Sequence, residues 1–227
     1  MSYVVYSVVR DSMTYSVYVH KSEGGVTLQN NIFINSVRHG ILITESSNAI
    51  LTSNIVLGTQ PRNATEPAQE KSSNYFICPD GGCDHISLQN NIAAGGFIGF
   101  LAAGQNCTET DGVELGTFSS LSDMLFIGNT AHSVNAGWYI ANPDNHACLS
   151  VGEFTAYRNS EVGVVSQVAL DALFLTNFKL LDNIQGTSFT IAHSSYTTFP
   201  RVTITSSLYM GTSFHVNCTD CASMECT

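Results

Sequence analysis

VTLQNNI at residues 26–32 returns almost unchanged as ISLQNNI at residues 86–92. Each copy is a short run of β-prone residues that closes on asparagine, and looser copies occur along the whole chain. The runs are VVYSVVRD (4–11), VTLQNN (26–31), AILTSN (49–54), ISLQNN (86–91), MLFIGN (124–129), FTAYRN (154–159), FKLLDN (178–183) and VTITSS (202–207).

A polar residue closes each run and gives the repeat its register. Successive closing residues are 20, 23, 37, 38, 30, 24 and 24 residues apart, so a period in the low twenties recurs. We interpret two of the longer intervals as loop insertions, at residues 59–82 and 104–120, because both are rich in turn residues. The closing residues are Asp11, Asn31, Asn54, Asn91, Asn129, Asn159, Asn183 and Ser207.

A second β-rich run follows within most repeats, for example GILIT (40–44), GFIGFLA (96–102) and VGVVS (162–166). A period in the low twenties with two or three short strands predicts an all-β fold, a right-handed parallel β-helix of about eight coils, as one domain over residues 1–227. A β-sandwich would instead need hairpin turns every 8–12 residues, but Asp80-Gly81 and Asp111-Gly112 both lie in the insertions.

The recurrent asparagines predict a structural ladder at one corner of the coils. Asparagine tolerates turn conformations, and stacked side-chain amides can bond to one another and to the backbone above and below. The predicted ladder consists of Asn31, Asn54, Asn91, Asn129, Asn159 and Asn183.

Composition narrows the class of protein. Charged residues make up 11% of the chain and hydrophobic residues 44%, which is too apolar for a disordered protein. The net charge of −10, from 8 basic and 18 acidic residues, disfavours a nucleic-acid partner. No apolar stretch reaches 18 residues, so we expect no membrane span in this chain.

Cysteines and glycosylation signals indicate an oxidising compartment. The chain has seven cysteines and three N-x-S/T sequons, at Asn63, Asn106 and Asn217. We therefore expect N-linked glycans at these asparagines and an extracellular or cell-surface location. The N-terminus lacks a signal-peptide pattern, so we expect a segment of a larger secreted protein.

Two disulfides are predicted within the body of the chain. Cys78 and Cys83 flank a turn at residues 79–82 that can bring them together, and Cys107 and Cys148 lie in loops of successive coils. Since seven is an odd number, at least one thiol is free or pairs outside the chain.

The tail at residues 215–227 is rich in cysteine. Its H-x2-C-x2-C-x4-C spacing could ligate zinc, but the sequon within it favours disulfides, inside the tail or with residues beyond it. We therefore predict no metal or cofactor. The tail residues concerned are His215, Cys218, Cys221 and Cys226.

No catalytic constellation emerges from the repeats. Glycan-cleaving sites need two ionisable groups close to one sugar bond, and the outer strand positions offer few. Arg38, His39 and Glu45 could form a small polar cluster, although a solvated corner explains them as well. The aromatic residues of the second runs are either core residues or sugar-stacking platforms: Phe97, Phe100, Trp138, Tyr139, Phe189 and Phe214.

Short motifs occur in a fixed order along the chain: VYVH (17–20), LQNN (28–31), RHGI (38–41), SNIV (53–56), FIGNTAHSVNAGWYI (126–140) and FKLLDNIQG (178–186). Together they resemble the parallel β-helix repeat region of the fibrocystin and fibrocystin-L family. This region is also similar to that of the cell-surface hyaluronidase (transmembrane protein 2) family. The resemblance implies a glycosylated ectodomain segment at the cell surface, including the ciliary or flagellar surface. It carries over no catalytic residue.

These observations predict an extracellular structural or adhesive module of a cell-coat or fibre-forming glycoprotein, with neighbouring copies or other domains stacked at the coil ends. A polysaccharide-active enzyme, hyaluronidase- or lyase-like, is the first alternative and is disfavoured by the missing ionic cluster. A non-catalytic module that binds extracellular polysaccharide is the second. Its signature would be an exposed row of aromatic rings on one face.

Overall fold

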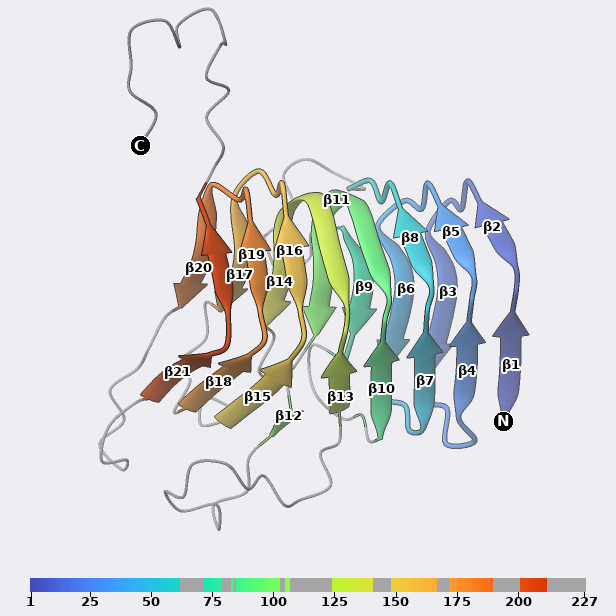
Figure 1. Cartoon of the computed structure of the whole chain (residues 1–227). Helices are drawn as coiled ribbons and strands as arrows, with labels where there is room; N and C mark the ends of the chain where they lie inside the picture. The colour runs from blue at the N-terminus through green and yellow to red at the C-terminus, as the bar shows by residue number, and fades with distance from the viewer. Residues whose placement is uncertain are drawn as a thin grey trace, which may run out of the picture.

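The computed structural model describes residues 1–61, 72–78, 83, 85–102, 105–106, 124–140, 148–166, 172–189 and 201–211. Within these residues the protein is all-β, with 22 strands in two sheets and no helix. Every strand pairing is parallel except one, between β12 and β15. The all-β prediction is therefore confirmed (Figure 1).

The first sheet takes one strand from each repeat. In spatial order its parallel strands are β1 (Ser2–Val5), β4 (Val26–Gln29), β7 (Ala49–Thr52), β10 (Ile86–Gln89), β13 (Met124–Ile127), β15 (Cys148–Gly152), β18 (Ala172–Thr176) and β21 (Arg201–Thr205). The short β12 (Gln105–Asn106) pairs with β15 in the antiparallel sense.

The second sheet has two wings. The front wing consists of β2 (Val8–Arg10), β5 (Ile32–Ile34), β8 (Ile55–Leu57), β11 (Ile92–Ala102), β14 (Thr130–Ile140), β16 (Thr155–Tyr157), β19 (Lys179–Leu181) and β22 (Leu208–Met210). The rear wing consists of β3 (Tyr15–His20), β6 (His39–Thr44), β9 (Ser73–Ile77), β17 (Val162–Ser166) and β20 (Gln185–Phe189). The long strands β11 and β14 run through both wings and join them.

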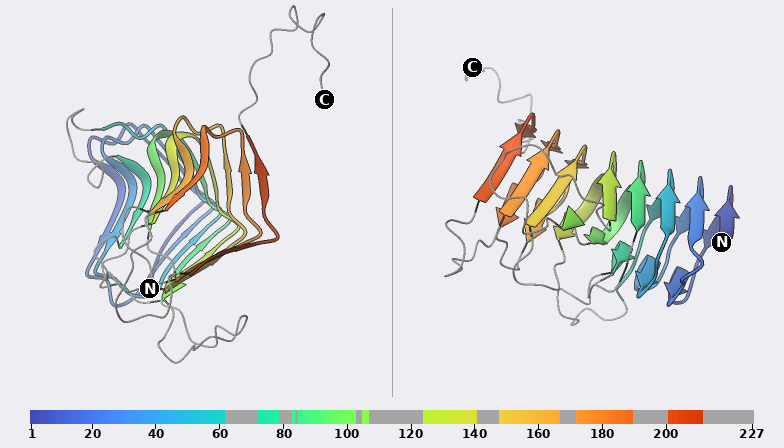
Figure 2. Two further views of the ribbon diagram at one scale, coloured as in Figure 1. Left: turned by 90° about the vertical axis from the view of Figure 1, so that its left-hand side faces the viewer. Right: turned by 90° about the horizontal axis from the view of Figure 1, so that it is seen from below.

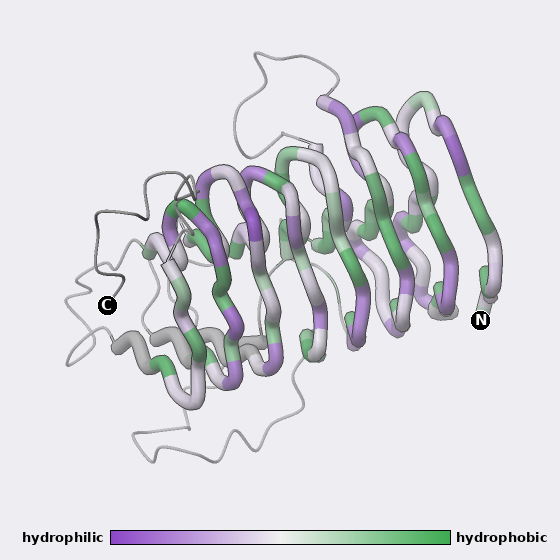
Figure 3. Tube along the Cα trace, turned by 45° about the horizontal axis from the view of Figure 1, so that its top comes forward, coloured by the Kyte–Doolittle hydropathy of each residue, from purple (hydrophilic) through white to green (hydrophobic). Residues whose placement is uncertain are grey.

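We call a first-sheet strand and the second-sheet strands that follow it a rung. Successive rungs lie side by side from β1 to β21, and seen along the row they overlie one another (Figures 1 and 2). Apolar segments return at matching places from one rung to the next (Figure 3). Each rung is thus built on its predecessor through in-register backbone hydrogen bonds.

The first corner joins the first sheet to the front wing and has the same length throughout. In all eight rungs that the structure describes, two residues separate the two strands, and the first of them has a positive φ. One left-handed residue redirects the chain sharply, which suits Gly, Asn and Ser better than branched side chains. These residues are Tyr6, Asn30, Ser53, Asn90, Gly128, Glu153, Asn177 and Ser206.

The second residue of the first corner builds a buried amide ladder. Asn31 Nδ2 donates to Asn54 Oδ1 at 3.0 Å, Asn54 Nδ2 to Asn91 Oδ1 at 3.0 Å, and Asn91 Nδ2 to Asn129 Oδ1 at 3.1 Å. Each of these amides also donates to a main-chain carbonyl one rung earlier, as Asn91 does to Leu51 at 2.8 Å. The amides are buried, and the side-chain nitrogen and oxygen of each have a hydrogen-bond partner, which is the condition for a polar group to stabilise a core.

The ladder differs from its prediction in one respect, because its six asparagines form two columns. Thr130 pairs with Thr155, so Phe154, not Asn159, stands opposite Asn129. Asn159 and Asn183 follow β16 and β19 at the second corner, where Asn159 N donates to Asn183 Oδ1 at 3.1 Å. The repeat period alone could not separate two corners that both favour asparagine.

Aromatic rings continue the first corner where the asparagines stop. Phe154 and Phe178 occupy the next two positions, are fully buried and lie 5.7 Å apart between ring centroids. Ser207 follows, and its Oγ accepts a hydrogen bond from Phe178 N at 3.1 Å. The corner position thus needs a buried side chain, and it tolerates an amide column or a ring column.

The loop boundaries also need correction. Residues 59–82 were interpreted as one insertion, but β9 lies inside that range and pairs with β6 and β11 in the rear wing. Residues 104–120 contain β12. The sequence SNYFI of β9 sits between turn-rich segments, and its pairing partners are distant in the sequence, so the local pattern did not reveal it.

The interior narrows where the rear wing approaches the front wing. A column of glycines in the rear wing, including Gly99, Gly137 and Gly163, faces small residues of the front wing such as Ala131 and Ala156. A Cβ on Gly137 would lie 2.4 Å from Gly163 O and 3.1 Å from the Ala156 Cβ. Glycine is needed here for close approach of two backbones, not for a turn.

We predict that Asn91→Ala lowers the free energy of unfolding by about 2–4 kcal/mol, because the donors of Asn54, the Leu51 carbonyl and Asn129 Oδ1 lose a buried partner. Denaturant unfolding followed by circular dichroism measures this. The control is Asn135→Ala, which removes solvent-exposed hydrogen bonds only. Equal losses in the two variants would contradict a stabilising ladder.

Gly137→Ala should destabilise the protein by about 2 kcal/mol or more, because the added methyl has no room between the wings. Gly152→Ala is the matched control in β15, since its Cβ would make only one ordinary contact, at 3.8 Å from Thr176 O. Thermal unfolding of both variants tests the packing. A Gly137→Ala melting temperature at or above that of Gly152→Ala would refute the narrow interior.

Candidate functional site

The outer face of the rear wing carries a cluster of aromatic rings at its N-terminal end. In β3, β6 and β9, Val17, Ile41 and Tyr75 share one register position and pack in the main core. The next residue of each strand points the opposite way, as strand geometry requires. We define the aromatic strip as Tyr15, Tyr18, His20, His39 and Phe76, whose rings contact one another around the outward Tyr18 and Phe76.

The rings of the strip lie close to one another. Tyr15 and His39 are stacked with their planes 6° apart and centroids 5.8 Å apart, and His39 lies 4.3 Å from Phe76. Tyr18 is 5.5 Å from Tyr15 and is stacked on His20 at 5.8 Å. Tyr18 is 55% exposed, whereas His39 is only 3% exposed. The strip is therefore exposed to solvent at Tyr18 and buried at His39.

His39 is held by Ser73 on the adjacent strand. Its Nδ1 accepts the Ser73 backbone N–H at 3.2 Å and lies 3.0 Å from Ser73 Oγ. Nδ1 is therefore the acceptor, which places the ring proton on Nε2. Burial, and to a lesser extent the charge of Arg38, lower the pKa of His39 to about 3. His39 is thus neutral at physiological pH and positions rings.

Arg38 borders the strip, and no carboxylate of the described residues forms an ion pair with it. Its Nη1 donates to Tyr15 Oη at 3.4 Å, and its Nε is shielded from solvent with no hydrogen-bond partner. A guanidinium favours planar anions such as carboxylates, which it can bind through two parallel hydrogen bonds. The strip therefore places the exposed Tyr18 near a cation that no carboxylate of the described residues neutralises.

Farther along the rear wing the outward residues form a second apolar cluster. The register position of Tyr18 continues through Leu42, Phe76, Leu101, Tyr139 and Val165. Leu101, Tyr139 and Val165 are at least 92% buried. The exposed part of this face is therefore its N-terminal end in β3, where Tyr18 is 55% exposed, whereas Leu42 of β6 is only 7% exposed.

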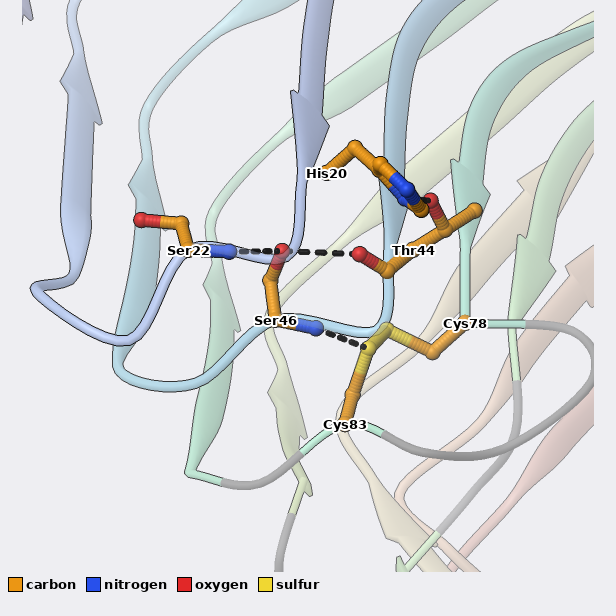
Figure 4. Close-up of a disulfide and its surroundings, with 6 residues drawn as sticks. All are labelled: His20, Ser22, Thr44, Ser46, Cys78 and Cys83. Atoms are coloured by element: carbon orange, nitrogen blue, oxygen red, sulfur yellow. Dashed lines mark hydrogen bonds between the residues drawn. A yellow bond between two sulfur atoms is a disulfide. The ribbon is translucent and has the colours of Figure 1, made fainter.

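A disulfide fixes the edge of the strip. Cys78 directly follows β9 and forms a disulfide with Cys83, as predicted from the turn between the two cysteines (Figure 4). Ser46 N donates to Cys83 Sγ at 3.4 Å, and Ser22 N donates to Ser46 Oγ at 3.1 Å. These contacts link three successive rungs at the corner that follows the rear wing.

The predicted polar cluster does not form as a unit. Glu45 pairs with Lys21 at 3.3 Å, while Arg38 and His39 belong to the strip. Of the aromatic residues singled out, Phe100 and Trp138 are fully buried in the main core, and Phe214 lies outside the described residues. Sequence reasoning missed Tyr15 and Tyr18. The alternation in YSVYVH places Tyr18 opposite Val17 and Val19, which pack on the core, but it does not signal Tyr15.

The remaining predicted modification and cysteine sites fall on segments that the structure leaves out. Asn106 and Cys148 lie in β12 and β15, whose side chains there are not described. The others lie outside the described residues: Asn63, Asn217, Cys107, Cys218, Cys221 and Cys226. Their glycosylation and pairing stay predictions.

An open hollow of about 430 Å³ lies over the first corner of the C-terminal rungs. Its ionisable lining residues are Glu153 and Lys179, so it offers one carboxylate and one amine. Acid–base cleavage of a glycosidic bond uses two carboxyl groups, which this lining does not supply. The hollow can hold a ligand but lacks the pair of groups for that chemistry.

Two further findings concern the described residues alone. No three His, Cys, Asp or Glu side chains among them gather at a spacing that would hold a metal ion. None of their secondary structure is a helix long and apolar enough to cross a bilayer.

Comparisons with protein-family models, curated proteins and solved structures found no match to this chain.

We predict that His39 makes the protein acid-sensitive. Its pKa is about 3 in the folded state and 6.5 when unfolded, so its stabilising effect is present above pH 6.5 and is lost as the pH falls toward 3. Between pH 6.5 and 5 the free energy of unfolding should drop with a slope approaching about 1.4 kcal/mol per pH unit from this group.

Denaturant unfolding at several pH values measures the slope. His39→Gln should reduce it, while His20→Gln, an exposed histidine of the same strip, serves as the control. An unchanged slope in His39→Gln would show that His39 does not stay neutral in the folded protein.

Proposed function

We propose that this chain is a right-handed parallel β-helix that serves as a structural or adhesive module of an extracellular, cell-surface glycoprotein. Right-handedness follows the general rule for connections between parallel strands of one sheet. Uniform parallel stacking of rungs with an internal amide ladder supports the β-helix. The proposal retains the resemblance to the fibrocystin family, which supplies its setting at the cell or ciliary surface.

The open ends of the stack carry the proposal. Within the described residues, β1, β2 and β3 pair with one neighbour each, as do β20, β21 and β22 at the other end. Among the described residues each of these strands has one edge on which a further strand can add, from a neighbouring copy or from another domain.

Apolar side chains are exposed at both ends. At the N-terminal end they are Met1, Tyr3, Val5, Tyr6, Val8, Met13 and Tyr18; at the C-terminal end they are Ile184, Ile204, Leu208, Tyr209 and Met210. Apolar surface together with free strand edges fits a stacking contact, because a neighbouring rung satisfies both at once. A second copy stacked head to tail would continue the rod, and repetition would give a filament.

An extracellular setting is supported by the Cys78–Cys83 disulfide, since such bonds persist in oxidising compartments. The three sequons point the same way and imply N-linked glycans. The hollow over the C-terminal rungs has a single carboxylate among its lining residues, whereas cleavage of a glycosidic bond uses two. A structural or adhesive module is therefore favoured over a polysaccharide-cleaving enzyme.

Charging the N-terminal end should abolish stacking. We expect the protein to associate with increasing concentration, and the double variant Tyr3→Lys, Val8→Lys to remain monomeric, because lysines on an edge strand oppose pairing. Sedimentation velocity over a concentration series measures this. Leu125→Lys is the control: it adds a lysine at an exposed apolar position in the middle of the first sheet.

A wild-type protein that stays monomeric at every concentration would overturn the stacking module. So would loss of association in the Leu125→Lys control to the same degree as in the double variant, because the contact would then not lie at the ends.

A further inference from the structure

We infer that the stacking partner is a second copy of this chain, joined head to tail in one fixed register. In this joint the first corner of one copy, at residues 206–207, receives the first corner of the next copy, at residues 6–7. The inference rests on the proposed stacking function and adds to it the register, the polarity and the hydrogen bonds of the contact.

Two backbone hydrogen bonds join the first corners of successive rungs. The first corner residue donates to the strand that precedes the corner in the next rung, as the Tyr6 N–H does to the Gln29 carbonyl at 3.1 Å. The strand that follows that corner donates back, as the Ile32 N–H does to the Ser7 carbonyl at 2.9 Å. The second bond is present at all seven junctions between the eight described corners, with lengths of 2.8–3.0 Å. A rung added at either end therefore meets the same requirements.

A third bond comes from a serine hydroxyl and is complete at two places in the structure. At the first corner, Ser207 Oγ donates to the Thr205 carbonyl at 2.9 Å and accepts the Phe178 N–H of the preceding rung at 3.1 Å. At the corner after the rear wing, Ser46 Oγ donates to the carbonyl two residues earlier at 2.8 Å and accepts the Ser22 N–H of the preceding rung at 3.1 Å (Figure 4). We call this pair of bonds the serine relay. One hydroxyl thus fixes the end of its own strand and receives the rung before it.

Ser7 has only the first half of the serine relay. Its Oγ donates to the Val5 carbonyl at 3.1 Å, which is again the carbonyl two residues earlier. Ser7 lies in the first rung, and the described residues place no strand before β1 or β2 in either sheet. A hydroxyl that donates its proton in this direction keeps its lone pairs for an N–H group of an added rung. Ser7 is therefore oriented as Ser207 is, with an acceptor position that no described residue fills.

The last described first corner presents the matching groups. Ser206 and Ser207 occupy the positions from which earlier corners bond the next rung, and the described residues contain no strand beyond β21 or β22. Extending the register of the earlier junctions to this end gives three bonds between copies. The Ser206 N–H donates to the Val5 carbonyl, and the Ser207 N–H donates to Ser7 Oγ. The Val8 N–H donates back to the Ser207 carbonyl.

These groups fix the polarity of the contact. The N-terminal corner offers two acceptors, the Val5 carbonyl and Ser7 Oγ, and one donor, the Val8 N–H, whereas the C-terminal corner offers two donors and one acceptor. The two ends are therefore complementary. Two N-terminal ends facing each other would set acceptor against acceptor and bury polar groups without partners, which opposes a head-to-head contact.

The same register continues the core across the junction. Ile204 and Tyr209 of the last rung extend two buried columns, yet they are 40% and 41% exposed because no described rung covers them. In the joint they meet Val4 and Val9, which pack against the core from the first rung. A shift by one residue would set these inward side chains against outward ones, so the apolar columns select the same register as the corner bonds.

Sedimentation velocity of the full chain over a concentration series tests the joint. Ser7→Ala should weaken association about tenfold, because the Ser207 N–H of the neighbouring copy loses its acceptor. Ser7→Asn should tighten association about fivefold, since asparagine at this corner both accepts from the preceding rung and donates to it, as Asn31 does at 2.9 and 2.7 Å. Ser46→Ala is the matched control, because it breaks a serine relay within one copy and should lower stability without changing association.

Photo-cross-linking reads the register directly. The photoreactive residue p-benzoylphenylalanine in place of Tyr6, which is 80% exposed, should cross-link two copies at residues 203–210 of the neighbouring copy. Mass spectrometry of mixed isotopically light and heavy chains separates links between copies from links within one copy. Links between two N-terminal ends, or links within one copy to residues 212–227, would overturn the inference. So would an associating sample that gives no link between copies at residues 203–210.

The outcomes separate the joint from stacking itself. If the wild type associates and the double variant Tyr3→Lys, Val8→Lys does not, but both Ser7 variants associate like the wild type, the ends stack without this joint and the inference alone fails. If the wild type stays monomeric, the stacking function fails with it. Circular dichroism of Ser7→Ala should match that of the wild type, because the Ser7 N–H keeps its bond to Asn31 Oδ1.

Discussion

The two-residue first corner is the constraint on which the rest of the structure depends. Its first residue turns the chain through a left-handed conformation, and its second sends a side chain into the interior. From Asn31 to Asn91 that side chain bonds its equivalent in the next rung and a backbone carbonyl in the preceding one. Because the connection never changes length, every strand on either side keeps its register, and the inward and outward faces stay in line.

This alignment decides which side chains of the chain come together. In-register rungs bring side chains from distant parts of the sequence into columns, so Tyr15, His39 and Ser73 meet across three strands although they are far apart in the chain. A column that faces inward becomes core, such as Tyr75 stacked on Phe100 at 4.5 Å. A column that faces outward stays exposed only where nothing covers it, as the aromatic strip does at Tyr18.

The sequence predicted the repeating rungs and the amide ladder because both arise from local, recurrent chemistry. It also predicted the Cys78–Cys83 bridge from the turn between the cysteines. It merged two asparagine columns, since Asn129 and Asn159 satisfy the same turn preference at different corners. It missed β9 and the outward tyrosines, because their places depend on partners in other rungs and on which face of a strand meets solvent.

The contrast between the corners has a consequence for how such a chain can vary in evolution. The first corner has two residues in every rung that the structure describes, whereas the connection before β9 spans residues 58–72 and the one before β6 only residues 35–38. A residue added at the first corner would shift an entire strand, but segments of any length can be inserted elsewhere without moving a column. Inherited length changes are therefore tolerated on one side of the molecule, and new loops can be acquired there while the scaffold remains the same.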